Sequence, residues 1–441
     1  MKPMADLLYG HKLSEGEPPE LADPFIAVGG TFRRKPAELG ISLDQLSKNM
    51  LFIGGTGSGK TNAIHLILRQ LRRKMTQDDV MIVFDTKGDF ERLFFDAARG
   101  DIVMGNSPQY RERSEKWNIY RDVLADGWND DTMGININEI SRALFEGNKS
   151  DAQPFFANAA RGVFSAQMLA TLRRAKTDKD IRKTKLNNRT LMEFFRGAAM
   201  EEYDSLARTY PDLRAIKMYL GDGSTGQALG VFAEIQVMLQ DTFLGVFADE
   251  GEFSIRDFVR EKGGRTLFLE YDLAIGDSLA PLYSLLMDLA LKEALGRSEE
   301  DGKRGNVYVV LDELKLLPQI THLDDVVNFG RGMGVKILAG LQSMTQIHDM
   351  YGEDKGEAIL AGFCSLLSFR PNDAKTREFV QGHFGRNMLN EVFDANNTIV
   401  SERRQGWAVE DWELSALQVG EAAVGLDSHP PFRFRFDLFG K

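Results

Sequence analysis

The sequence of 441 residues has few of the features that mark secreted or metal-binding proteins. Its single cysteine, Cys364, excludes an internal disulfide, and its position in the apolar run 358–369 predicts a buried thiol in a reducing compartment. The six histidines are scattered without the spacing of metal ligands. We therefore expect no metal site that protein ligands build by themselves.

The sequence also has no long hydrophobic run. Its first residues lack the apolar segment of a signal peptide. A membrane-spanning helix needs about 20 mostly apolar residues. The best candidates, 229–247 and 279–291, contain Glu234, Asp241 and Asp288. The sequence therefore predicts a soluble, cytoplasmic protein.

Positive charge is not in excess either. The net charge is −11, with 54 basic and 65 acidic residues, which argues against a protein that simply coats DNA. A local basic channel would escape this count, because binding depends on where the charge lies. With 43% hydrophobic and 27% charged residues, the composition is that of a folded globular protein.

The hydrophobic pattern predicts an α/β domain with a parallel sheet. A short apolar strand at 49–54 precedes a glycine-rich turn, a helix from Lys60 to about Lys74 and a second buried strand at 79–84. Strand patterns return at 265–271, 306–311, 335–341 and 365–369, with helices between them.

Between these strands the pattern at about 136–259 is helical. We interpret the chain as one α/β domain that is interrupted by an all-α insertion. The predicted parts are 1–180, which forms the first half of the α/β domain with lead-in strands, 181–255, which forms the insertion, and 256–441, which forms the second half.

The turn after the first strand carries a phosphate-binding motif. Residues Gly54, Gly55, Thr56, Gly57, Ser58, Gly59, Lys60 and Thr61 fit the pattern G-x-x-x-x-G-K-[ST] between a strand and a helix. Glycines let backbone N–H groups surround phosphates at the positive end of the helix. Lys60 should reach the terminal phosphates of ATP, and the Thr61 hydroxyl should bind Mg²⁺.

Two carboxylates follow the apolar strand 306–311. Asp312 should hold Mg²⁺ through water, and Glu313 should polarise the attacking water. One acidic residue alone would be explained as a cap at the strand end, but a pair beside a nucleotide loop favours catalysis.

Weaker candidates lie at other strand ends. Asp85 and Lys87 follow the strand that we expect to adjoin the nucleotide loop, although acids at such ends are common in ordinary turns. Arg331 lies among glycines before the strand 335–341 and by itself fits a surface residue. Gln342, at the end of that strand, fits a polar cap equally well.

Taken in order, these segments resemble the type IV coupling proteins, the TraG/TraD family of conjugation and secretion ATPases. The matching segments include FIGGTGSGKT, IVFDTKGD, WNIY, PFFANAARGVF, FSIRDFV, LDELKLL and FGRGMGVKILAGLQSMTQI. The resemblance covers roughly residues 25–437. The nucleotide loop is generic, whereas the last segment, placed after LDE, is specific to this family.

The resemblance implies a RecA-like motor domain with an inserted all-α domain, and a hexamer with nucleotide at its subunit interfaces. It implies that DNA, often bound to a relaxase, is moved toward a type IV secretion channel. Arg331 matches the arginine that completes a neighbour's site, and Gln342 matches the glutamine thought to sense the γ-phosphate.

The sequence departs from the family pattern in lacking the two transmembrane helices with which most members begin. We therefore expect partner proteins to recruit this chain to the inner membrane. Two alternatives stay open. One is a soluble DNA pump similar to HerA or FtsK, and the other is an ATP-gated docking platform that delivers protein substrates.

Overall fold

The structure, a computed structural model, describes residues 4–146, 154–274, 276–296, 305–395, 398–427 and 429–440. The chain forms two compact units. Unit 1 comprises Met1–Arg99, Gly263–Thr266 and Arg297–Lys441, and unit 2 comprises Gly100–Lys262 and Leu267–Gly296.

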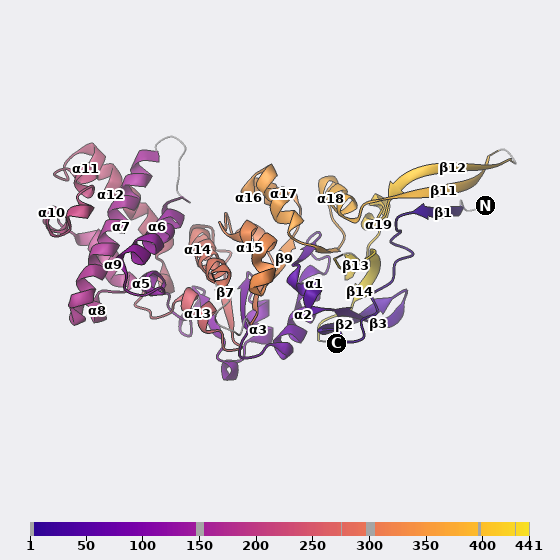
Figure 1. Ribbon diagram of the computed structural model, residues 1–441, viewed down its shortest axis with the longest axis horizontal. Coiled ribbons are helices and arrows are strands. Elements are labelled where there is room, and N and C mark those ends of the chain that lie inside the picture. The colour runs from indigo at the N-terminus through magenta and orange to yellow at the C-terminus, as the bar shows by residue number, and fades with distance from the viewer. Residues whose placement is uncertain are drawn as a thin grey trace. The chain divides into compact units, whose positions relative to one another are not determined.

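Unit 1 contains most of the strands (Figure 1). Its strands are β1 (Met4–Tyr9), β2 (Ile26–Phe32), β3 (Lys35–Ile41), β4 (Met50–Ile53), β5 (Val80–Asp85), β8 (Val307–Leu311), β9 (Val335–Leu341), β10 (Ser365–Ser368), β11 (Arg386–Ala395), β12 (Thr398–Trp407), β13 (Glu421–Gly425) and β14 (Phe432–Phe436). Its helices are α1 (Leu43–Ser47), α2 (Lys60–Lys74), α3 (Asp89–Phe94), η1 (Ala97–Arg99), η5 (Leu314–Leu316), α15 (Leu323–Phe329), η6 (Gly330–Met333), α16 (Thr345–Tyr351), α17 (Glu353–Ala361), α18 (Ala374–Phe384) and α19 (Asp411–Ser415).

The main sheet of unit 1 has parallel strands at its centre. Its order within this unit is β3-β2-β14-β13-β10-β4-β9-β8-β5. From β10 to β5 every pair is parallel, whereas from β10 to β3 every pair is antiparallel. Strands β4, β5, β8 and β9 are buried along their whole length, as parallel strands are when both faces are covered.

The strands predicted around the nucleotide loop are confirmed as β4, β5, β8, β9 and β10, and the helix from Lys60 to Lys74 has the predicted bounds. One expectation is wrong. Strand β5 does not adjoin β4, because β9 and β8 lie between them. Parallel strands are joined by crossover connections, so the next strand in the sequence need not be the next in the sheet. Cys364 is half-buried rather than fully buried.

A second, smaller sheet of unit 1 has the order β1-β11-β12 and is antiparallel throughout. In Figure 1, β1 lies beside β11 although the two strands come from opposite ends of the chain.

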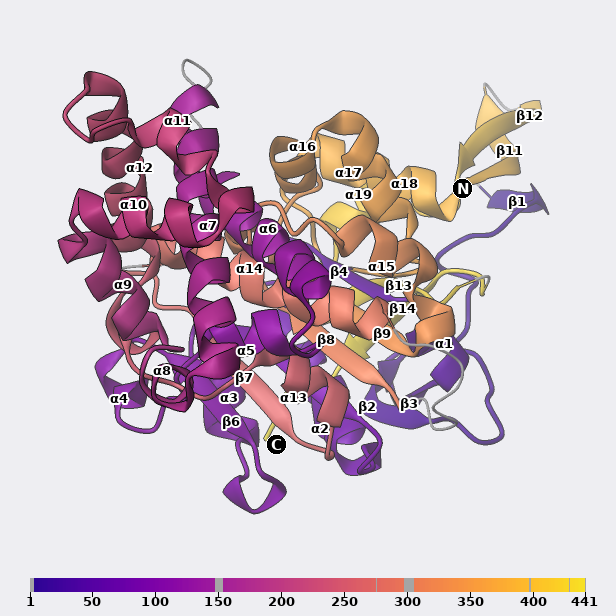
Figure 2. The same cartoon turned by 60° about the vertical axis from the view of Figure 1, so that its left-hand side comes forward.

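Unit 2 is mostly helical (Figure 2). Its elements are β6 (Ile102–Gly105), α4 (Pro108–Arg111), α5 (Ile119–Leu124), α6 (Asp130–Glu146), α7 (Pro154–Thr177), α8 (Lys179–Thr184), α9 (Asn188–Gly197), α10 (Met200–Thr209), η2 (Pro211–Leu213), α11 (Ile216–Leu220), α12 (Gly226–Thr242), η3 (Gly245–Ala248), α13 (Ile255–Glu261), β7 (Thr266–Glu270, which begins at the unit boundary) and α14 (Gly276–Leu295).

The helical pattern expected at 136–259 is confirmed where the structure describes it, and residues 147–153 lie outside the described part. Helix α7 packs against α6, α8, α11 and α12. Helices α9 to α12 lie in the range predicted for the insertion, whose limits at 181 and 255 stay a prediction. No helix among the described residues is both long enough and apolar enough to cross a bilayer.

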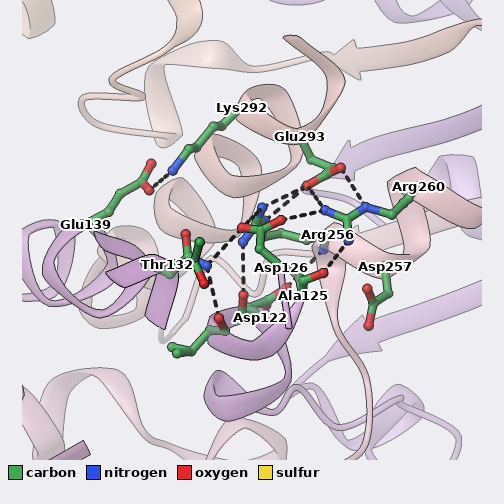
Figure 3. Close-up of polar contacts among 12 residues, drawn as sticks. Asp122, Ala125, Asp126, Thr132, Glu139, Arg256, Asp257, Arg260, Lys292 and Glu293 are labelled. Carbon is green, nitrogen blue, oxygen red and sulfur yellow. Dashed lines mark hydrogen bonds and ion pairs between the residues drawn. The ribbon is translucent and has the colours of Figure 1, made fainter. Parts of the chain in front are cut away.

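A charged cluster joins α13, α14 and the loop after α5 (Figure 3). The Arg256 guanidinium, 5% exposed, lies 2.7 Å from Asp126 and 3.1 Å from Glu293. Arg260 contacts the same two carboxylates at 3.0 and 2.9 Å. Burial raises the pKa of Asp126, but hydrogen bonds from Asn136 and Arg256 outweigh this effect and lower it to about 2. The buried Arg256 side chain therefore ties Asp126, and with it the loop after α5, to α13 and α14.

Candidate nucleotide-binding site

The loop between β4 and α2 has a backbone that only glycine adopts readily at three positions. Gly54, Gly57 and Gly59 have φ values of +153°, +72° and +112°. A Cβ atom on Gly59 would lie 2.8 Å from the Cα atom of Gly420. The loop is therefore shaped by its glycines, and Gly59 packs closely against Gly420.

Lys60 begins α2 and is 8% exposed. Its Nζ atom donates to the carbonyl oxygens of Gly54 at 2.5 Å and Gly55 at 3.4 Å. Burial lowers the pKa of Lys60, and the negative charges of Asp312 and Glu313 oppose this effect. The ammonium group thus lies inside the curl of the loop, close to two carboxylates.

Asp312 follows β8 directly, and its carboxylate faces the loop. The Thr61 hydroxyl lies 3.0 and 2.9 Å from the two Asp312 oxygens, to which it can donate. Burial raises the pKa of Asp312, and the hydrogen bond from Thr61 opposes this effect. A hydroxyl and a carboxylate side by side form the hard oxygen donor set that Mg²⁺ prefers.

Gln342 connects the loop to Glu313. Its Nε2 atom donates to Oε2 of Glu313 at 2.8 Å, and its Oε1 atom accepts from the Thr56 hydroxyl at 3.2 Å. The other Glu313 oxygen, Oε1, is buried and finds no hydrogen-bond donor among the described residues. These three side chains meet because β9 lies between β4 and β8, and parallel strands end at the same edge of a sheet.

A cavity of about 260 Å³ opens where these groups meet. It is lined by residues 56–62 of the loop and helix start, and by Lys87, Asp89, Asp312, Glu313 and Gln342. The structure thus brings together most of the residues singled out in the sequence. Asn62 and Asp89 also line the cavity, but the sequence patterns did not single them out. Asn62 directly follows the phosphate-binding motif and Asp89 lies two residues after Lys87, so closeness to these predicted residues could have indicated them.

Asp85 does not line the cavity. It is 1% exposed, and its carboxylate accepts hydrogen bonds from the backbone N–H groups of Lys87, Gly88, Phe90 and Glu91. Burial raises the pKa of Asp85, and these four hydrogen bonds oppose the effect. Asp85 therefore shapes the turn that carries Lys87 into the cavity.

Arg331 lies on η6 and does not line the cavity. Its side chain is 57% exposed, and its Nη2 atom lies 2.6 Å from the Asp44 carboxylate on α1. An exposed ion pair of this kind contributes little to stability, roughly 0–1 kcal/mol. The side chain can therefore exchange Asp44 for another anionic partner at low cost.

The residues present fit a magnesium nucleotide. The loop offers a backbone cradle at the start of a helix, Lys60 and Lys87 offer positive charge, and Thr61 with Asp312 offers oxygen ligands for the cation. The buried Oε1 atom of Glu313 adds an acceptor that has no described donor.

Comparison with known proteins agrees with this geometry. Residues 33–411 match the family model described as the type IV secretion-system coupling protein DNA-binding domain. The chain is 23% identical over 353 residues to the coupling protein TraD of Escherichia coli (strain K12), a match that covers 79% of this chain and 45% of TraD. The chain thus spans less than half the length of that relative.

Solved structures of the plasmid coupling protein TrwB have a similar fold. The complex of TrwB with the ATP analogue ADPNP matches with a TM-score of 0.71 and 20% identity, over 97% of this chain and 96% of that chain. The complex with ADP and Mg²⁺ matches with a TM-score of 0.68 and 21% identity, over 96% and 97%. The expected RecA-like P-loop fold is confirmed.

Proposed function

Because the chain belongs to the type IV secretion-system coupling protein family, we propose that it is an ATP-driven motor that moves DNA toward a conjugative secretion channel. The observation that carries this proposal is the cavity in which the phosphate loop, Asp312, Glu313 and Gln342 converge in a chain of this family. Its cofactors are then ATP and Mg²⁺, as the TrwB complexes with ADPNP and with ADP and Mg²⁺ suggest by analogy.

Bound Mg-ATP would supply the phosphoanhydride bond that is cleaved and a cation that neutralises charge. Lys60 leaves the carbonyl oxygens of its own loop and binds phosphate instead, since both are acceptors for the same ammonium group. Thr61 would bind the cation directly and Asp312 would hold it through water. Lys87, which the Asp85 turn directs into the cavity, adds positive charge.

Glu313 acts as the general base. Its buried Oε1 atom, which has no described donor, can accept a hydrogen bond from water and then its proton. Gln342 holds the other oxygen of Glu313 and at the same time the Thr56 hydroxyl. A shift of the loop at Thr56 would therefore move Gln342 and, with it, the Glu313 carboxylate, which fits the role of a γ-phosphate sensor.

The partners follow from the family. We infer that the substrate is DNA, commonly carrying a relaxase or another secreted protein, and that channel components recruit the chain to the inner membrane. Arg331, exposed and outside its own cavity, fits a residue that serves a neighbouring subunit in a homo-hexamer.

The motor proposal predicts that DNA accelerates ATP hydrolysis. The stimulation should be strong at about 50 mM salt and fade by about 200 mM, because phosphate contacts release counterions. The measurement is phosphate release with and without DNA in a preparation shown to be hexameric. Lys60→Ala, which lacks the phosphate-binding ammonium group, serves as the background.

Stimulation by a protein substrate alone, with no response to any DNA at low salt, would support the docking platform and reject the motor. Equal turnover by Lys60→Ala and the wild-type chain would reject the nucleotide site itself.

Gln342→Ala should bind ATP normally but hydrolyse it about tenfold to about a hundredfold more slowly, since a hydrogen bond to a charged group contributes roughly 1.5–3 kcal/mol. Single-turnover hydrolysis and equilibrium binding of a fluorescent ATP analogue separate the two effects. Gln346→Ala is the matched control, because the Gln346 side chain accepts a hydrogen bond from the backbone N–H of Gln342 at 3.1 Å and does not line the cavity. An equal loss in both variants would show that Gln342 merely supports the strand end.

A further inference from the structure

A second cavity, of about 650 Å³, lies entirely within unit 2. Its walls come from α5 and the loop that follows it, from α8 and from the segment before α13. Helices α5 and α8 lie near each other in both views (Figures 1 and 2). The cavity shares no residue with the nucleotide site.

One wall of this cavity is positively charged. Lys179, Arg182 and Lys183 line it from α8, where their spacing of three and four residues places them on one face. Within the described part of the chain, none of the three forms an ion pair. The two acids that line the cavity from the segment before α13 have partners of their own, since Glu252 pairs with Arg121 and Glu250 with Arg189. The cavity therefore offers uncompensated positive charge in a chain whose net charge is −11.

The arginine of this wall is stacked and fixed. The Arg182 guanidinium lies 4.6 Å from the centre of the Trp128 ring. Its Nε and Nη2 atoms each donate at 2.9 Å, to the carbonyl oxygens of Ala175 and Lys176 at the end of α7. These three contacts orient the exposed Arg182 guanidinium group. Because its position is already fixed, the side chain loses little conformational entropy when a ligand binds.

The loop that carries Trp128 is held by the charged cluster of Figure 3. Asp126, two residues before Trp128, accepts from Arg256 at 2.7 Å and from Asn136 at 3.0 Å, and the preceding carbonyl, of Ala125, accepts from Arg260. The arginines of α13 therefore fix the position of the loop after α5. The Trp128 ring lines the cavity beside Arg182 of α8.

We propose that this cavity binds one unpaired nucleobase of single-stranded DNA together with its flanking phosphates. The base stacks against the planar Trp128–Arg182 pair, and Lys179 and Lys183 contact the phosphates. A base that is still paired in a duplex cannot enter such a pocket, whereas an unstacked base can. An acidic peptide could pair with the lysines and Arg182, but it has no planar ring to stack against the Trp128–Arg182 pair. This inference rests on the proposed role in DNA transfer.

The charge part of the proposal is tested with a fluorescein-labelled oligothymidylate and the full chain, by fluorescence anisotropy at about 50 to about 200 mM salt. The double variant Lys179→Ala/Lys183→Ala should reduce the steepness of the plot of log K against log[salt] by about 1.4, because each phosphate contact to a single strand contributes about 0.7 to the slope. The matched control, Arg196→Ala/Arg208→Ala, removes the same charge from exposed positions on α9 and α10 and should leave the slope unchanged.

The stacking part is tested with Trp128→Ala, which should bind oligothymidylate about fivefold to about 150-fold more weakly, whereas Trp128→Phe should retain most of the affinity. Circular dichroism and binding of a fluorescent ATP analogue at the distinct site in unit 1 check that the variants fold. The lysine variants keep the proposal testable should Trp128→Ala not fold.

The outcomes separate this proposal from the proposed function. A wild-type chain that binds oligothymidylate, with all cavity variants unchanged, overturns the cavity assignment and leaves the motor intact. A wild-type chain that binds no DNA overturns both. Displacement of oligothymidylate by polyglutamate, with Trp128→Ala behaving as wild type, also overturns the proposal, because charge alone would then explain binding.

Discussion

Arg331→Ala should bind ATP normally and hydrolyse it about 10³ to 10⁵ times more slowly, the range that a trans-acting arginine contributes in phosphoryl transfer. The side chain is exposed on η6, outside the cavity of its own subunit, and forms an ion pair with the exposed Asp44 carboxylate. Its guanidinium is therefore available to neutralise charge on the γ-phosphate of a neighbour. The measurement is steady-state phosphate release by assembled protein.

Mixing distinguishes action in trans from action in cis. Arg331→Ala and Lys60→Ala subunits should each be inactive alone, whereas a mixture should regain part of the activity at junctions that combine an intact loop with an intact arginine. If no mixture recovers, Arg331 serves its own subunit or only the structure. Asp44→Asn is the control for the ion pair, and its rate should stay near wild type, since an exposed pair contributes roughly 0–1 kcal/mol.

Glu313→Gln should bind Mg-ATP but hydrolyse it about 10² to 10⁴ times more slowly, the contribution of a general base. The amide keeps the shape of the carboxylate and can still bond to Gln342, so the loss is that of the proton acceptor. Rapid-quench hydrolysis with saturating nucleotide measures this step.

Asp312→Asn provides the contrast to Glu313→Gln, because Asp312 contacts Thr61 and belongs to the cation site. Asp312→Asn should bind Mg²⁺ more weakly, so the Mg²⁺ concentration that gives half-maximal hydrolysis should rise. A slow Asp312→Asn beside a normal Glu313→Gln would show that the two roles are assigned the wrong way round. Glu353→Gln on α17, outside the cavity, controls for the change in charge.

Local chemistry in the sequence determined the nucleotide loop and the elements around it. Gly54 to Thr61 form a motif of eight successive residues, and the strand before it and the helix after it have strong hydrophobic patterns. The Asp312–Glu313 pair is likewise recognisable because it follows an uninterrupted apolar strand. Such features depend on neighbours in the chain, so no tertiary contact is needed to see them.

The strands near the C-terminus were not predicted. Strands β11 to β14 are antiparallel, and their pairing partners include β1, β2 and β10, which lie far away in the sequence. The domain limits at 181 and 255 stay a prediction, because the helical pattern continues across them without a linker.

Only the tertiary structure decided which strand ends meet. The sequence predicted that Asp85 would adjoin the loop, but the order β4-β9-β8-β5 places Gln342 and Glu313 there and leaves Asp85 to bind its own turn. The cavity with Trp128 and Arg182 was likewise invisible in the sequence, since its walls come from separate segments of unit 2. The physical reason is the same in both cases. Motifs arise from residues that are close in the chain, whereas the strand order and the packing of helices depend on burying apolar faces across long loops.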